Sequence, residues 1–98
     1  MNIVLEKNGS ELTAAVEGWL DTNTAPDFES RVFGELDGVD KLTLDLEKLE
    51  YISSAGLRSL ILLAQEMEDR GELLIRNVCP AVMKVFSLTG LADDLNIV

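Results

Sequence analysis

Histidine is missing from this 98-residue sequence, and cysteine occurs only once, as Cys79. Without histidine, the chain can form neither a Ser-His or Cys-His catalytic dyad nor a His-ligated zinc site. It also lacks a Gly-x-x-x-x-Gly-Lys or Gly-x-Gly-x-x-Gly phosphate-binding loop and a convincing pair of carboxylates for acid–base catalysis. We therefore expect a protein that is not an enzyme, has no catalytic residues and requires no cofactor or metal ion.

Long apolar runs are also absent. The longest one, Leu60–Ala64, is too short to span a bilayer, and Met1–Glu6 has no basic region followed by an apolar one, as a signal peptide would. A lone cysteine cannot form an internal disulfide, which suits a reducing compartment. These features predict a cytoplasmic protein without membrane insertion.

Basic residues are scarce: 8 Lys and Arg stand against 18 Asp and Glu, for a formal net charge of −10. Such a surface repels phosphate backbones and anionic membranes, so we expect no nucleic-acid binding. The charge is uneven, because residues 1–50 contain 12 acidic and 4 basic residues, against 6 and 4 in residues 51–98. The acidic first half favours a partner with a basic surface.

Apolar residues make up 47% of the chain, which is enough for one hydrophobic core, so we expect one domain over residues 1–98. Two short apolar runs, Ile3–Leu5 and Leu12–Val16, flank the segment Lys7–Ser10. The Asn-Gly dipeptide in that segment tolerates positive φ at both residues, which predicts an antiparallel β-hairpin.

A first helix is predicted after this hairpin. Thr24 can cap it, Pro26 suits its first turn, and Asp27 favours the positive end of the helix dipole. Gly38 is expected to end it, after a face formed by Phe28, Val32 and Leu36. Trp19, which precedes this helix, is expected to pack in the core or at its rim rather than to serve as a stacking platform.

The middle of the chain alternates strictly over Leu42–Leu46, which predicts a strand, followed by a loop that ends at Tyr51-Ile52. Ser54–Arg70 is the clearest helix, with Gly71 at the position of a C-terminal cap. Its apolar stripe consists of Leu57, Leu60, Ile61, Ala64 and Met67.

The last third is expected to hold a short strand, Leu73–Ile75, and a helix that starts at Pro80 and ends before Gly90. The face of this helix is formed by Val82, Val85, Phe86 and Thr89. The element order is β-β-α-β-α-β-α, with or without a final strand at Leu95–Val98. It predicts an α/β fold: a mixed four- to five-stranded sheet with helices packed against it, and a right-handed parallel crossover between the third and fourth predicted strands.

In such folds, sites lie beyond the carboxyl ends of the strands, where helices begin. Here that place is the segment Tyr51–Leu57, which contains Ser53 and Ser54. One interpretation is purely structural, since a serine at this position caps the helix. The other is a phosphorylation or anion site, because free N–H groups and the positive helix end would receive a phosphate. Both can hold together, with Ser53 as the cap and Ser54 exposed.

Three segments carry a family resemblance. Asp45–Leu57 resembles a stretch that ends in Asp-Ser-(Ser/Thr)-Gly-Leu, and Gly18–Ala25 resembles Gly-x-Leu-Asp-x-x-Thr-Ala. Pro80–Phe86, with Gly90-Leu91 downstream, resembles Pro-x-Val-x-x-x-Phe and a following Gly-Leu. These motifs occur together, in the same order along the chain as here, in STAS domains of the bacterial anti-sigma-factor antagonist (anti-anti-sigma factor) kind. The chain resembles that family over nearly its whole length.

The resemblance implies a role in transcription regulation. Such proteins bind an anti-sigma factor, usually a serine kinase, and so release a sigma factor. The kinase phosphorylates the serine after the motif's Asp and ends the binding, and a protein phosphatase resets the switch. Matched position by position, the acceptor is Ser54. Ser53 stands where the family has Asp, which makes it a second candidate acceptor, and Ala55 stands where the family has Ser or Thr.

A partner surface can be predicted on the same helix. Ser54, Arg58 and Leu62 are spaced i, i+4 and i+8, so they form one outward line, with Leu62 as an apolar anchor. Arg58 could instead pair with a phosphate on Ser54. Asp21 is either structural or part of the surface. The full predicted surface consists of Ser53, Ser54, Ala55, Gly56, Arg58, Leu62, Asp21 and Thr22.

One alternative function stays open at this point. The chain could be a STAS subunit of a transporter or signalling assembly, in which the serine-rich turn is a docking surface that is never phosphorylated.

Overall fold

A β-hairpin begins the fold in the computed structural model, which describes residues 1–98. Strand β1 (Asn2–Asn8) pairs antiparallel with β2 (Glu11–Leu20), and Asn8 lies opposite Glu11. The predicted hairpin is therefore confirmed. In its turn, only Gly9 has a positive φ, of 64°. The expectation that Asn8 also adopts a positive φ is wrong. Asn8 extends the strand instead.

Three further strands run parallel to β2. β3 (Lys41–Asp45) and β5 (Glu72–Arg76) complete the order β1-β2-β3-β5, and β4 (Leu49–Ile52) pairs with the end of β2. The sheet is thus mixed and five-stranded, as predicted. The expectation of a loop that ends at Tyr51-Ile52 is wrong, because this segment contains β4. Two exposed residues separate the buried Leu49 and Ile52, so this strand shows no simple alternation.

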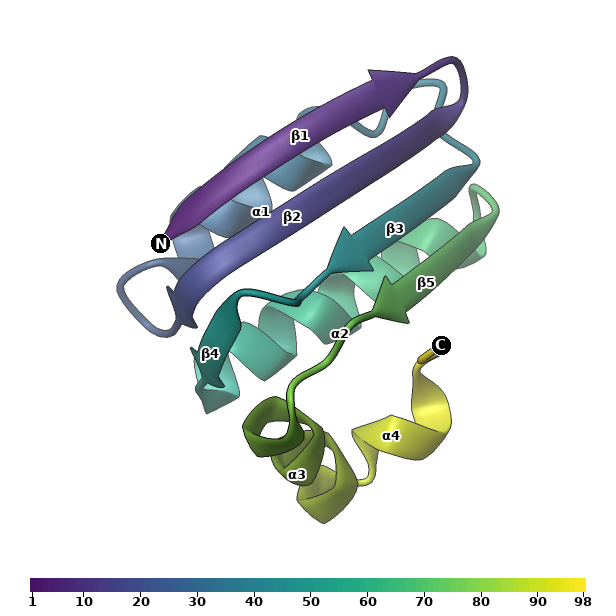
Figure 1. Cartoon of the computed structure of the whole chain (residues 1–98). Coiled ribbons are helices and arrows are strands. Elements are labelled where there is room, and N and C mark those ends of the chain that lie inside the picture. Colours follow the sequence, from purple (N-terminus) through teal and green to yellow (C-terminus); the bar gives the residue numbers. More distant parts are fainter.

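Two helices cover one face of the sheet. α1 (Ala25–Phe33) and α2 (Ser54–Glu68) lie side by side behind the strands in Figure 1. The core between these helices and the sheet is a cluster of 23 buried residues, in which Phe28 and Leu60 are fully enclosed. The opposite face of β1, β2 and β3 carries no helix (Figure 1).

The predicted helix boundaries and faces need three corrections. α1 ends at Phe33, and Leu36 is buried although it lies beyond the helix. α2 ends at Glu68, and its buried face is rotated relative to the prediction: Leu63 is fully buried, whereas Ile61 is 37% exposed. α2 contacts α1 on one side and β4 and β5 of the sheet on the other.

The C-terminal part packs beside β4 and the end of β5. α3 (Pro80–Thr89) buries Val82 and Phe86 as predicted, but Thr89 is exposed. A short α4 (Leu91–Asp94) follows, and the final strand reduces to one bridge between Ile75 and Ile97. None of the four helices has the length and apolar character needed to cross a bilayer.

Gly71 does not cap α2, because its φ is not positive. Instead, it lies against the backbone of Asp40, and a Cβ atom at Gly71 would overlap the Asp40 carbonyl group. The neighbouring Glu72 N–H donates to that carbonyl at 3.0 Å. Gly71 is therefore needed for the close approach of two connections at one end of the sheet.

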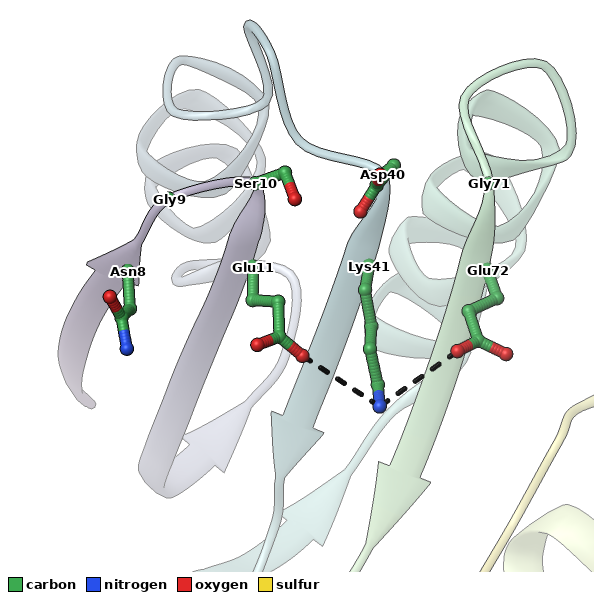
Figure 2. A pocket seen from close by; sticks show the side chains of 8 residues that line it. All are labelled: Asn8, Gly9, Ser10, Glu11, Asp40, Lys41, Gly71 and Glu72. Carbon is green, nitrogen blue, oxygen red and sulfur yellow. Dashed lines mark ion pairs between the residues drawn. The ribbon is translucent and has the colours of Figure 1, made fainter.

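That end of the sheet carries the row of charges shown in Figure 2. Lys41 Nζ lies 3.8 Å from Glu11 Oε1 and 3.9 Å from Glu72 Oε1, across three neighbouring strands. The surrounding depression, of about 680 Å³, has no hydrophobic residue in its lining. Because parallel strands start here, this end lies opposite the first turn of α2.

We predict that Gly71→Ala lowers the free energy of unfolding by about 3 kcal/mol, because the backbone of Asp40 has to move. Gly38→Ala is the matched control. Its Cβ would meet nothing within 4 Å, so only its φ of 76° opposes the change, at about 1 kcal/mol. Urea unfolding of both variants measures the difference, and equal losses would contradict the steric explanation.

We also predict that Lys41→Met destabilises the fold by about 0.5 kcal/mol at low salt, since Glu11 and Glu72 then flank β3 with no cation between them. The loss should vanish in 1 M NaCl, where the Debye length falls from about 10 Å at 0.1 M to about 3 Å. Lys84, which forms no ion pair, supplies the control Lys84→Met. A loss that does not depend on salt would indicate packing by the lysine stem instead.

Candidate functional site

The candidate site begins where β2 and β4 end and α2 starts. The Ser53 N–H donates to the Leu20 carbonyl at 2.9 Å, which ties the start of α2 to the end of β2. Ser53 Oγ accepts a hydrogen bond from the Gly56 N–H at 3.4 Å, and the Leu57 N–H donates to the Ser53 carbonyl at 2.9 Å. Ser53 has extended backbone angles and is the N-cap of α2. The capping half of the prediction is confirmed.

Ser54 is the first residue of α2 and is exposed. Its hydroxyl forms no hydrogen bond within the chain, in contrast to Ser53. The first turn of α2 holds no acidic residue, so no carboxylate there opposes an anion. A group attached to Ser54 Oγ therefore projects into solvent beside the free N–H groups and the positive end of the helix.

Gly56 brings α2 into direct contact with the strand ends. A Cβ atom at this position would lie 2.6 Å from the Leu20 carbonyl oxygen and 2.7 Å from Ile52 Cγ1. Gly56 is itself buried and adds no exposed surface, and Ala55 is half-buried. The small residues of the motif thus serve close packing in this structure.

The loop between β2 and α1 is a polar turn. Asp21 Oδ1 accepts hydrogen bonds from the N–H groups of Asn23, at 2.9 Å, and Thr24, at 3.1 Å. Thr24 Oγ1 accepts from the Asp21 N–H and donates to the Trp19 carbonyl. Thr24 is the N-cap residue of α1, as predicted, but its side chain forms no capping hydrogen bond, because this hydroxyl points back into the turn. Thr22 is exposed at the tip.

The outward line on α2 exists in the structure. Ser54, Arg58 and Leu62 are all exposed, and Leu62 is 38% exposed. Arg58 forms no ion pair, so its guanidinium is available to an external group.

Leu62 also borders a groove between α1 and α2. The groove has a volume of about 620 Å³, and Phe33 and Leu62 are its two hydrophobic residues. Carboxylates of Glu29, Glu66 and Asp69 stand around them. The apolar end of the line therefore lies next to negative charge.

An exposed aromatic pair completes this end of the molecule, and sequence reasoning missed it. Trp19 and Tyr51 are register partners on β2 and β4, with ring centroids 5.1 Å apart and an interplanar angle of 49°. Trp19 is 56% exposed and Tyr51 46%, so Trp19 does not pack in the core, which was one of the two positions expected for it. The sequence signal that could have predicted this exposure is Leu20, which a strand buries in the core. Because adjacent residues of a strand point to opposite faces, a buried Leu20 places Trp19 on the outer face.

The chemistry available here is recognition. No group of three or more His, Cys, Asp or Glu side chains is placed to hold a metal ion. On α2 the site offers an unbonded hydroxyl, a free guanidinium and one apolar side chain, and the ends of β2 and β4 add an aromatic pair.

Comparisons with known proteins identify the family of this chain. The STAS domain model matches residues 2–98. A protein of Bordetella bronchiseptica named as a candidate anti-sigma factor antagonist, BtrV, is 34% identical over 92% of this chain and 79% of its own length.

Solved structures share the fold. An anti-sigma factor antagonist from Mycobacterium paratuberculosis superimposes with a TM-score of 0.88 at 24% identity, over 98% of this chain and 83% of the other. The Bacillus cell fate determinant SpoIIAA in its phosphorylated form gives a TM-score of 0.77 at 20% identity, over 99% and 91%. The match over residues 2–98 and the 34% identical relative show that the chain belongs to the STAS domain family.

Proposed function

We propose that this protein is an anti-sigma-factor antagonist, which binds an anti-sigma factor and so releases a sigma factor. The anti-sigma factor is a serine kinase that phosphorylates Ser54, and a protein phosphatase restores the unmodified state. Family membership and the name of the Bordetella relative support the antagonist role. The exposed, unbonded hydroxyl of Ser54 at the start of a capped helix is the observation that carries the switch.

Phosphorylation of Ser54 is compatible with the fold. A phosphoryl group adds about −1.5 to −2 charges and three acceptor oxygens. At Ser54 it would lie beside the positive end of α2, with no acidic residue in the first turn. The phosphorylated protein therefore keeps the same fold, and the change is confined to its surface.

That surface change is large enough to end binding. A dianion placed inside an interface meets like charges and loses solvent, at a cost of several kcal/mol. Each 1.4 kcal/mol corresponds to about a tenfold change in affinity. A cost of two or three times this amount therefore weakens binding by about 100- to 1,000-fold.

Ser53 is a weaker acceptor than Ser54 on structural grounds. Its hydroxyl is half-buried and accepts the Gly56 N–H bond, so phosphorylation would remove the cap of α2. The free-energy cost of losing this cap makes Ser54 the favoured acceptor. Ser53 then acts mainly by holding Ser54 in its exposed position.

The proposed partner surface extends from the turn at Asp21 and Thr22, across Ser53 and Ser54, to Arg58 and Leu62. The Ser53–Leu20 hydrogen bond keeps the turn and the helix start adjacent. Ala55 and Gly56 shape this surface through their small size. Arg58 lies one helical turn after Ser54 and either contacts the partner directly or neutralises the phosphate after release.

We predict that the protein isolated from its native host carries a single phosphate on Ser54 in a fraction of the molecules. Intact-mass measurement followed by fragmentation locates it, and the Ser54→Ala variant should carry none. Ser87→Ala, at another exposed helical serine, is the control and should keep the phosphate. A chain that stays unmodified in growth, starvation and stress would instead favour a constitutive docking subunit of a larger assembly.

We also predict that Leu62→Ala weakens binding of the anti-sigma factor about tenfold, because an anchoring side chain is lost from the interface. Ile61→Ala is a matched control, since Ile61 is 37% exposed but lies off the line formed by Ser54 and Arg58. Isothermal titration calorimetry measures both. Equal affinities for the two variants would exclude Leu62 as an anchor.

A further inference from the structure

Trp19 and Tyr51 are the most exposed aromatic residues of the chain. Phe28 and Phe86 are fully buried, and Phe33 packs against the core. Trp19 and Tyr51 are 56% and 46% exposed, yet they contact one another at a centroid distance of 5.1 Å. Neither is needed to fill the core, so their place on the surface calls for another explanation.

The backbone holds this pair in a defined place. The register of β2 and β4 shifts between Gly18 and Trp19, and Trp19 then lies opposite Tyr51. The next residues along the two strands, Leu20 and Ile52, are buried against α2. The rings therefore lie on the face of the sheet that α1 and α2 do not cover, beside the start of α2.

The charge around the pair is negative. Residues 17–21 and 47–52 contain Glu17, Asp21, Glu47 and Glu50, against two cations, Lys48 and the Met1 amino group, which lies beside Gly18. The face of an aromatic ring attracts cations, and nearby carboxylates strengthen that attraction. A guanidinium suits both features, because it stacks on aromatic faces and donates to carboxylates in its own plane.

We infer that Trp19 and Tyr51 form an aromatic platform that receives an arginine of the anti-sigma factor. This inference rests on the proposed function and adds to it a contact on the strand side of the Ser54 surface. The net charge of −10 opposes both the phosphate backbone of a nucleic acid and a second copy of the chain as the occupant. Trp and Arg are also the residue types that dominate binding energy in interfaces.

The experiment uses the fact that Trp19 is the only tryptophan. The chain is labelled with 5-fluorotryptophan, so that one fluorine resonance reports on this position alone. The probe is the purified anti-sigma factor of the host that binds the unphosphorylated wild-type chain. We expect the resonance to shift on complex formation and to stay unchanged when the chain alone is concentrated.

Substitutions then separate stacking from simple apolar contact. Trp19→Leu should weaken binding about tenfold or more, and Trp19→Phe should weaken it less, because phenylalanine retains an aromatic face. Leu88→Ala, which truncates an apolar side chain on α3 that is 77% exposed, is the control and should bind as the wild type does. Urea unfolding checks that each variant keeps its stability.

The arginine itself is found by replacing single surface arginines of the anti-sigma factor with lysine. One of these replacements should weaken binding as much as Trp19→Leu does. The two substitutions combined should weaken binding no further than either alone, as a double-mutant cycle requires for a direct contact.

The outcomes distinguish the two proposals. If no anti-sigma factor binds the wild-type chain, the proposed function fails and the platform with it. If one binds, but Trp19→Leu binds equally well and the resonance does not move, only the platform is overturned. A shift caused by concentration of the chain alone would assign the rings to a contact between two copies and would also overturn the inference.

Discussion

The contact between Gly56 and the carbonyl end of β2 positions everything else at this end of the molecule. The Leu20 carbonyl oxygen accepts the Ser53 N–H and leaves no room for a side chain at Gly56. Any larger residue would push the first turn of α2 away from the sheet. Capping by Ser53, exposure of Ser54 and the closeness of the Asp21 turn all depend on this approach.

Electrostatics then gives the site its character. The chain is acidic overall, but the first turn of α2 contains no carboxylate, and Arg58 forms no ion pair within the chain. An anion at Ser54 is therefore tolerated by the protein that carries it. The same anion is unfavourable to a partner that packs against it, since an interface excludes the water that would otherwise solvate the charge. A surface of this kind can be switched without a change of fold.

The two ends of the sheet differ in what they can do. At the starts of β2, β3 and β5, charges are paired in a row and the depression between them is polar (Figure 2). At the opposite end, apolar and aromatic side chains remain exposed beside an unbonded hydroxyl. Desolvation of the first end would cost energy, whereas covering the second would release water from apolar surface. This asymmetry favours the second end as the interface.

Local patterns in the sequence were sufficient for much of this description. The periodicity of Leu42–Leu46 and of Ser54–Arg70 predicted β3 and α2, because side-chain alternation depends only on backbone geometry. The Ser53 cap and the exposure of Ser54 followed from the rules for helix starts. The family motifs, which span most of the chain, predicted the STAS fold.

Other features depended on contacts between distant segments. The sequence did not predict β4, because its four residues become a strand only by pairing with the end of β2. The position of Gly71 predicted a helix cap, but its role is to allow the close approach of the Asp40 backbone. Trp19 and Tyr51 are apolar enough for a core, and only the tertiary structure decided that they lie on the face that α1 and α2 leave uncovered. The sequence by itself therefore determined the elements and the local chemistry of the serine turn. The tertiary structure decided strand partners, close approaches and the uncovered face, since each requires residues far apart in the chain to meet.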